Sequence, residues 1–380
     1  MRLSTYHYAR AQGWDRSLDP SLDGPTTWII VFGAPAIADL AQGLADLHRV
    51  YPRAVWTGCS TAGEVLGDSL HDDSLVVAVL QFSHTRLLLA SAPIASPMES
   101  AQVGVQLGAQ LNAPDLKAVF LLSDGLSVNG SSLIEALSSQ FAAGVVVTGG
   151  LAGDGDRFQK TWVIGPDHSA QTQTVTAVGL YGERLGVGHA SRGGWDVLGP
   201  EREITQSLGN VVFSIDEQPA LALYKKYLGE RAQGLPATGL LFPLAIRNER
   251  HEDGDTVRTI LAVNEADNSI TFAGDVPQGS KVRLMRANFE RLIDGAEDAA
   301  HHLALGPNAS GPLLIIGISC VGRRLVLGQR TEEEIEAVRR ALPPDSSFVG
   351  YYSYGELSPL ASGRCELHNQ TMTLTSVWET

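Results

Sequence analysis

Hydrophobic and polar positions along the chain repeat one plan three times. Each copy begins with an apolar run, continues into a segment with apolar residues every three or four positions, and ends in a second apolar run followed by glycines. Apolar runs rich in β-branched residues are typical of buried strands, and the three- to four-residue spacing is typical of amphipathic helices. The pattern therefore predicts three strand–helix–strand units, over residues 27–67, 118–155 and 312–357.

The first and third units also share the spacing of the turn that ends them. Residues 58–64 and 350–356 both have the pattern G-x-x-x-x-G-E, and a further strand pattern follows each unit, such as SLVVAVLQF after the first. In the third unit, Thr331 and Glu334 have the spacing of a helix capping box. These features predict an α/β fold: a β-rich core of repeated strand–helix–strand units with helices on the outer faces, in two tightly associated domains.

The region between the second and third units follows a different pattern. The segment GHASRGGWDVLGP at 188–200 predicts an irregular loop, because its glycines and proline interrupt any periodicity. A helical pattern near residue 217 then marks a domain boundary. On this basis the chain divides into an N-terminal extension (1–26), an N-terminal domain (27–216) and a C-terminal domain (217–380).

Charge and cysteine content narrow the classes of function. The net charge is −14, and an acidic chain repels phosphate backbones, so no nucleic-acid partner is expected. The three cysteines are scattered without metal-binding spacing, which is typical of a protein from a reducing compartment. The first residues have no apolar signal-peptide core, and no stretch of 18 apolar residues occurs. We therefore expect a cytoplasmic protein with no membrane partner.

The glycine-rich turns do not have the residues of a known enzyme motif. A phosphate loop needs lysine after its last glycine, whereas this chain has Glu64 and Glu356 there, and a carboxylate repels phosphate. The sequence has no G-x-S-x-G nucleophile motif and no H-E-x-x-H zinc motif. We therefore expect no enzyme activity. The alternative is an enzyme that uses Glu64 or Glu356 as a base in a glycine-rich pocket.

Three glycine-rich segments follow buried strands, namely TGCSTAGE, TGGLAGDG and YYSYGELS. If the units pack around one centre, these strand ends bring backbone N–H groups, hydroxyls and carboxylates to one pocket suited to a small polar ligand. In the alternative interpretation, the glycines only turn the chain. The residues predicted to bind the ligand are Cys59, Ser60, Thr61, Glu64, Gly150, Gly153, Asp154, Tyr354 and Glu356.

The same segments resemble the FIST family of sensory domains. The matching motifs include TGCSTAGEVLGD at 57–68, FLLSDGLSVNGSSLI at 120–134 and TGGLAGDG at 148–155. They continue in the C-terminal part with GYYSYGEL at 350–357 and CELHNQTMTLT at 365–375. The resemblance extends from about residue 27 to residue 380. It implies a FIST N-type sensory domain followed by a FIST C-type domain.

This resemblance implies a bacterial sensor that binds a small ligand and signals to a separate protein such as a histidine kinase. The chain also resembles NosP, a haem-binding and nitric-oxide-sensing subgroup of FIST proteins, which implies haem b as the cofactor. Haem iron needs an axial ligand, and the candidates are His189, close to Arg192 and Trp195, and His368. Two alternatives stay open: a sensor of a small metabolite such as an amino acid, and an interaction scaffold.

Overall fold

All three predicted units fold as two parallel strands joined through at least one helix. The computed structural model describes residues 1–247, 255–306, 311–360 and 362–380. The first unit consists of β3 (Thr27–Gly33), α1 (Ala41–Val50) and β4 (Val55–Ser60). The second consists of β9 (Leu116–Ser123), α3 (Gly130–Ser138) and β10 (Val146–Leu151). The third consists of β24 (Leu314–Cys320), α6 (Val321–Leu327), α7 (Thr331–Ala341) and β25 (Ser347–Ser353).

Each unit forms the middle of one sheet. An antiparallel strand lies beside the first strand of each unit: β7 (Ser74–Gln81), β13 (Thr174–Tyr181) or β28 (Met372–Glu379). The remaining strands are β1 (Arg2–Ala9), β2 (Gly13–Trp14), β5 (Glu64–Leu66), β6 (Ser69–His71), β8 (Arg86–Pro93), β11 (Val163–Ile164), β12 (Ala170–Gln171), β14 (Leu185–Arg192), β26 (Gly355–Pro359) and β27 (Cys365–His368). The strand order is β12-β11-β4-β3-β7-β1-β2 in the first sheet, β27-β26-β10-β9-β13-β8 in the second and β14-β28-β24-β25-β5-β6 in the third.

The three sheets face one central core. Because alternate residues of a strand point to opposite faces, Ile30 of β3 points into this core while Ile29 and Val31 pack on the side of α1. The second sheet contributes residues such as Phe120 to the core, and the third sheet residues such as Ile316. Burying one such side chain stabilises a fold by about 1.5–3 kcal/mol, so the shared core holds the three sheets together.

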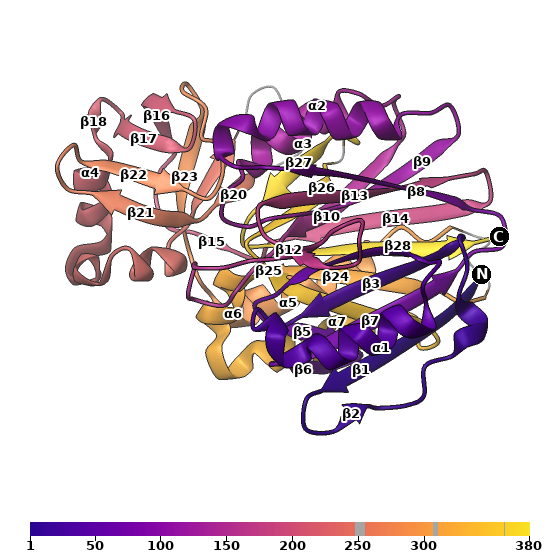
Figure 1. Cartoon of the computed structure of the whole chain (residues 1–380). Coiled ribbons are helices and arrows are strands. Elements are labelled where there is room, and N and C mark those ends of the chain that lie inside the picture. Colours follow the sequence, from indigo (N-terminus) through magenta and orange to yellow (C-terminus); the bar gives the residue numbers. More distant parts are fainter. Residues whose placement is uncertain (248–254, 307–310, 361) are drawn as a thin grey trace.

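Helices cover the outer faces of these sheets (Figure 1). Helix α1 packs on the first sheet, and α2 (Ser100–Leu111) and α3 pack on the second. Helices α5 (Phe289–His301) and α7 pack on the third. This arrangement confirms the predicted α/β class with a β-rich core and outer helices. We refer to the three sheets and their helices as the body.

The chain leaves each unit to pair with the second strand of another unit. After the first unit, β5 pairs with β25, and Glu64 lies opposite Tyr351. After the third unit, β26 pairs with β10, and Glu356 lies opposite Gly150. After the second unit, β11 pairs with β4 and closes the cycle. The exchange pairs strands from both sides of the predicted boundary at residues 216 and 217, so the two parts of the chain are tightly associated.

Residues 196–247 and 255–286 form a separate lobe at one end of the body (Figure 1). Its elements are β15 (Asp196–Val197), β16 (Arg202–Leu208), β17 (Val211–Ile215), β18 (Gln218–Pro219), α4 (Ala220–Leu228), β19 (Leu244–Arg247), β20 (Thr256–Arg258), β21 (Ile260–Asn264), β22 (Ser269–Phe272) and β23 (Lys281–Arg286). The main strand order is β20-β19-β23-β16-β17-β22-β21. The lobe has its own apolar core, which includes Ile204, Leu221 and Phe272.

Two local predictions were wrong. The segment predicted as a loop at 188–200 begins as part of β14. Its glycines follow from close packing, since a Cβ at Gly188 would lie 1.8 Å from Ala304 O. The predicted capping box does not form, because α7 begins at Thr331 itself and the Glu334 side chain pairs with Arg323 in the interior.

The N-terminal extension is part of the body. Strand β1 pairs with β7 from Arg2 to Ala9, at the side of the first sheet away from β4. The N-terminal amine forms an ion pair with Glu379, 3.3 Å away, at the end of β28 in the third sheet. Across the described residues, no helix combines the length and the apolar character needed to cross a membrane.

Candidate functional site

The three glycine-rich turns converge, as predicted, at one end of the body. Each turn donates a backbone hydrogen bond to the next, so the three bonds form a closed ring. The bonds join Ala62 N to Tyr352 O (2.8 Å), Gly153 N to Ser60 O (2.9 Å) and Tyr354 N to Leu151 O (3.4 Å). The predicted ligand residues Gly153 and Tyr354 therefore lie at equivalent places around one centre, and the predicted ligand residue Ser60 accepts the bond from Gly153.

The centre of this ring is filled by protein. Cys59 and Tyr351 are both fully buried there. A Cβ at Gly150 would lie 2.6 Å from the Tyr351 hydroxyl, so a glycine is required opposite that ring. Burial raises the pKa of the Cys59 thiol well above its usual range, which keeps the thiol protonated and unreactive. Close packing, rather than a ligand, thus accounts for Cys59 and Gly150, two of the predicted site residues.

Glu64 is enclosed by hydroxyl groups of the first unit and of strand β7 beside it. Its carboxyl group accepts hydrogen bonds from Thr61 Oγ1 and from Ser74 Oγ (2.8 Å), and the residue is 1% exposed. Burial raises the pKa of Glu64 to about 8, although the bonds from Thr61 and Ser74 oppose that shift. The carboxyl group is therefore mostly protonated at neutral pH.

Glu356 repeats this arrangement in the third unit. It accepts hydrogen bonds from Ser353 Oγ (2.8 Å) and Thr371 Oγ1 (2.9 Å), and it is 0% exposed. Burial raises the pKa of Glu356 to about 8 as well, against the lowering effect of both hydroxyls. After the second unit, the residue that pairs in the same way is Val163, opposite Cys59. Its side chain is apolar and buried, so it needs no hydroxyl partners. Neither carboxyl group is placed to reach a substrate, so the alternative of a glutamate base has no geometric support.

Asp154 fixes the loop that follows the second turn. Its carboxylate accepts hydrogen bonds from the backbone N–H groups of Phe158 (2.9 Å), Gln159 (2.9 Å) and Lys160 (2.8 Å), and from the Tyr354 hydroxyl. Desolvation raises the pKa of Asp154, but these hydrogen bonds outweigh it and lower the pKa overall. The loop that Asp154 holds places the Phe158 ring on Tyr354, with centroids 4.5 Å apart and an interplanar angle of 13°.

A cavity of ≈ 870 Å³ lies between the body and the lobe. On the body side it is lined by residues at the carboxyl ends of strands and in the loops that follow them, among them Leu126, Leu151, Cys320, Gly322, Tyr354 and Asn369. On the lobe side its lining includes Asn210, Pro236, Ala237, Thr259, Ile260 and Phe272. The carboxyl ends of strands in α/β sheets are the usual place for ligands, and the volume is within the range of small-molecule sites.

The cavity and the predicted ligand residues overlap only in part. Tyr354 lines the cavity, whereas Glu64, Glu356 and Asp154 are not among its described lining residues. The same is true of Cys59, Ser60, Thr61, Gly150 and Gly153. The lining residues that sequence reasoning missed include Thr259 and Phe158, and they come from the lobe and from the loop after Asp154. No motif marks them, because their proximity depends on how the lobe packs on the body.

The two candidate haem ligands lie close together inside the body. His189 is on β14, opposite Thr375, and His368 is on β27, with its Nε2 3.0 Å from Ser358 O. Burial lowers the pKa of His368 to about 4, with a further lowering from the nearby His189. Burial also lowers the pKa of His189. Both imidazoles are therefore neutral at pH 7, but neither histidine is among the described residues of the cavity wall.

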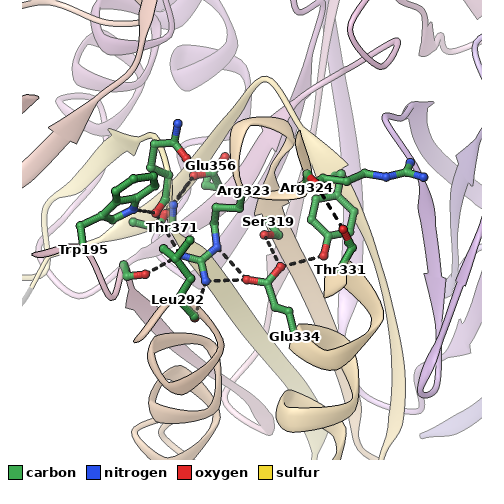
Figure 2. A network of polar contacts seen from close by, with 12 residues as sticks. Trp195, Leu292, Ser319, Arg323, Arg324, Thr331, Glu334, Glu356 and Thr371 are labelled. Carbon is green, nitrogen blue, oxygen red and sulfur yellow. Dashed lines mark hydrogen bonds and ion pairs between the residues drawn. The ribbon is translucent and has the colours of Figure 1, made fainter. Parts of the chain in front are cut away.

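A buried charged network adjoins the cavity wall (Figure 2). Arg323 follows the lining residues 320–322, and its Nη2 is 2.5 Å from Glu334 Oε1, with both side chains 0% exposed. The same guanidinium donates to Leu292 O (2.7 Å), to Gln370 O (3.2 Å) and to Gly193 O. Because Gly193 and Leu292 lie just outside the two ends of the lobe segment, Arg323 joins the cavity wall to both of its connections.

Within the described part of the chain, no cluster of three or more His, Cys, Asp or Glu side chains is placed to hold a metal ion. The site is therefore described by its shape, its apolar wall and a few polar groups. Such a cavity between a body and a smaller lobe is typical of proteins that bind small organic ligands.

Comparison with known families agrees with this description. The model of the FIST N domain matches residues 27–218, and the model of the FIST C domain matches residues 220–359. The chain therefore belongs to the FIST family, whose domains are sensory ligand-binding domains of signalling proteins rather than catalytic domains. A search of curated proteins returned no significant match.

Proposed function

We propose that this protein senses a small organic molecule that binds in the cavity between the body and the lobe, and that it signals to a separate protein such as a histidine kinase. The observation that carries this proposal is the cavity itself. Its volume of ≈ 870 Å³ is near the upper end of sites for drug-sized ligands. Its wall is largely apolar, with a few polar groups that can fix a ligand's orientation.

The mouth of the cavity supports the signalling part of the proposal. Leu126, Phe158, Leu261 and Leu325 line the cavity and are also exposed at the surface. Exposed apolar side chains that gather in one place often mark an interaction site. A protein bound over the mouth would contact both the ligand's surroundings and the lobe, so it would respond to the presence of the ligand.

Filling the cavity tests this proposal. Ala237 lines the cavity and is exposed, so Ala237→Trp adds a large ring at the mouth without entering the core. We expect this variant to bind the apolar fluorescent probe Nile red at least about tenfold more weakly than the wild type, a loss of roughly 1.4 kcal/mol. Fluorescence titration measures both affinities.

The matched control is Ala266→Trp, which adds the same ring at an exposed position of the lobe away from the described cavity wall. This control is expected to bind Nile red as the wild type does. Equal affinity for all three proteins would place the ligand site elsewhere. No binding to any of them would favour an interaction scaffold without a ligand.

Haem b is the second candidate ligand, with nitric oxide as the sensed gas. The observation that favours it is the close pair His189 and His368, because haem iron binds a neutral imidazole. The cavity itself does not fit haem. Neither histidine is on its described wall, and the described lining residues include no arginine or lysine for the propionates. His368 is also engaged with Ser358 O inside a packed interface.

Spectroscopy separates the two candidates. After reconstitution with haem, we expect no stoichiometric Soret band that depends on a histidine of the body. His189→Ala and His368→Ala should accordingly give the same spectrum as the wild type. A one-to-one Soret band that shifts or disappears in either variant would establish haem as the ligand and contradict the cavity proposal.

A further inference from the structure

Several polar atoms on the cavity wall, or directly behind it, are buried without a hydrogen-bond partner. Among the described residues, they include Thr259 Oγ1, Asn369 Oδ1 and both amide atoms of Gln370. Thr259 and Asn369 line the cavity, and Gln370 packs behind the lining residue Gly322, where a Cβ would lie 2.5 Å from its Nε2. Unpaired buried polar groups destabilise a fold, so their concentration at one cavity indicates a partner that binds there.

Asn369 has an unpartnered hydrogen-bond acceptor just beneath the body side of the wall. Its Nδ2 donates to His368 O at 3.0 Å, and the residue is 0% exposed. The amide cannot be turned over, because its oxygen would then face another carbonyl oxygen. Oδ1 has almost no accessible surface in this structure, so a donor from a ligand or from water reaches it when the Asn369 side chain shifts toward the cavity that this residue lines.

Thr259 presents a second unpartnered group on the lobe side. It lies between β20 and β21, and its backbone oxygen accepts a hydrogen bond from Ala273 N at 2.8 Å. This bond fixes the residue, yet its hydroxyl has no partner although the side chain is buried. A hydroxyl both donates and accepts, so it suits several polar groups of a ligand.

The charges of the wall restrict the ligand further. Within the described lining, Asp156 is the one carboxylate, and there is no arginine, lysine or histidine. An anion moved from water into this largely apolar cavity would lose hydration without gaining a cation. A neutral molecule does not face that penalty, and a cation has Asp156 as a partner.

We infer that the ligand is an apolar, neutral or cationic molecule that donates a hydrogen bond to Asn369 Oδ1 and contacts Thr259 in the same bound state. This inference rests on the proposed function and names the class of ligand for that cavity. Because Asn369 belongs to the body and Thr259 to the lobe, the ligand bridges the two. Ligand binding therefore holds the lobe against the body, which is the kind of change that a partner can detect.

Three related probes test the class of ligand. Carbazole is neutral, apolar and has one N–H donor, N-methylcarbazole lacks that donor, and carbazole-3-carboxylate adds an anionic group. We expect the wild type to bind carbazole roughly three- to tenfold more tightly than N-methylcarbazole, the range of one net hydrogen bond, and the carboxylate most weakly. Fluorescence titration gives the three affinities.

Substitutions at the two unpartnered groups complete the test. Asn369→Leu and Thr259→Val keep the approximate shape but remove the polar atoms. We expect Asn369→Leu to abolish the preference for carbazole over N-methylcarbazole. We expect Thr259→Val to unfold at an unchanged urea midpoint, because the hydroxyl that it removes makes no hydrogen bond in the protein. Thr176→Val is the control, because the Thr176 hydroxyl is buried and donates to Ile164 O at 3.0 Å, so this variant should unfold at a lower midpoint.

Each outcome decides the inference. If carbazole and N-methylcarbazole bind the wild type equally, or if Asn369→Leu keeps the preference, Asn369 Oδ1 is satisfied by water and the inference is wrong. If none of the probes binds, the class of ligand is wrong. Failure of the proposed function looks different, because in that case the Ala237→Trp variant binds Nile red as the wild type does.

Discussion

Replacing Glu334 with alanine is expected to lower the free energy of unfolding by about 3–5 kcal/mol, the range for breaking one half of a buried ion pair. The substitution leaves the Arg323 guanidinium, which is 0% exposed, without its carboxylate. It also removes the acceptor for the Tyr352 hydroxyl, which donates to Glu334 Oε2 at 2.7 Å, and for Ser319 Oγ. Urea titration followed by circular dichroism measures the change.

Two further variants make this result specific. Glu333→Ala removes the neighbouring carboxylate of the same helix, which pairs with Arg330 at the surface, and it should leave the unfolding free energy nearly unchanged. The double variant Arg323→Met with Glu334→Leu removes both buried charges, so it should be less destabilised than Glu334→Ala. If Glu334→Ala is no more destabilised than Glu333→Ala, the network of Figure 2 does not hold the cavity wall in place.

Stability should also fall as the pH rises from about 6.5 to about 8. Below pH 6.5, histidines such as His368, whose pKa burial lowers to about 4, change stability in the opposite direction. Glu64 and Glu356 each have a pKa raised from 4.5 to about 8 by burial. Between these values the folded protein keeps protons that the unfolded chain releases, so the free energy of unfolding decreases with pH. The stabilisation is fully present below the unfolded pKa and is lost as pH passes the folded pKa. The expected loss is on the order of a few kcal/mol for the pair.

Glutamine at both positions tests this pH dependence. Glu64→Gln with Glu356→Gln keeps the shape of the protonated side chains and an acceptor for the hydroxyls of Ser74 and Thr371. We expect this double variant to match the wild type at pH 5 and to exceed its unfolding free energy at pH 8. A wild-type profile that is flat across this range, or a variant that follows the wild-type slope, would show that both carboxyl groups are ionised in the folded state.

The sequence predicted the units of the body because their strands are buried on both faces. Such strands appear as continuous apolar runs, like the one that becomes β24, and they are easy to recognise. The glycines in the turns were harder to interpret. A glycine is needed at position 150 because a Cβ there would clash with the hydroxyl of Tyr351, which lies 201 positions later in the chain. Local sequence therefore could not distinguish a packing requirement from a ligand site.

The candidate site was largely hidden from sequence reasoning for the same reason. Asn369 and Thr259 have no distinctive sequence context, and they meet at one cavity only because the lobe packs on the ends of the body strands. His189 was predicted to lie in a loop since glycines surround it, whereas Gly186 and Gly188 make room for Trp378 and for Ala304 O beside a regular strand. Glycine in a strand often marks such close approach, but the approaching group is not visible in the sequence.

The central claim is that the ligand binds between the body and the lobe. The most direct test is a crystal structure of the protein saturated with carbazole. The account predicts one carbazole in the cavity, with its nitrogen at hydrogen-bond distance from Asn369 Oδ1 and its rings in contact with Thr259. Carbazole bound at another place, with the cavity holding only water, would contradict the account.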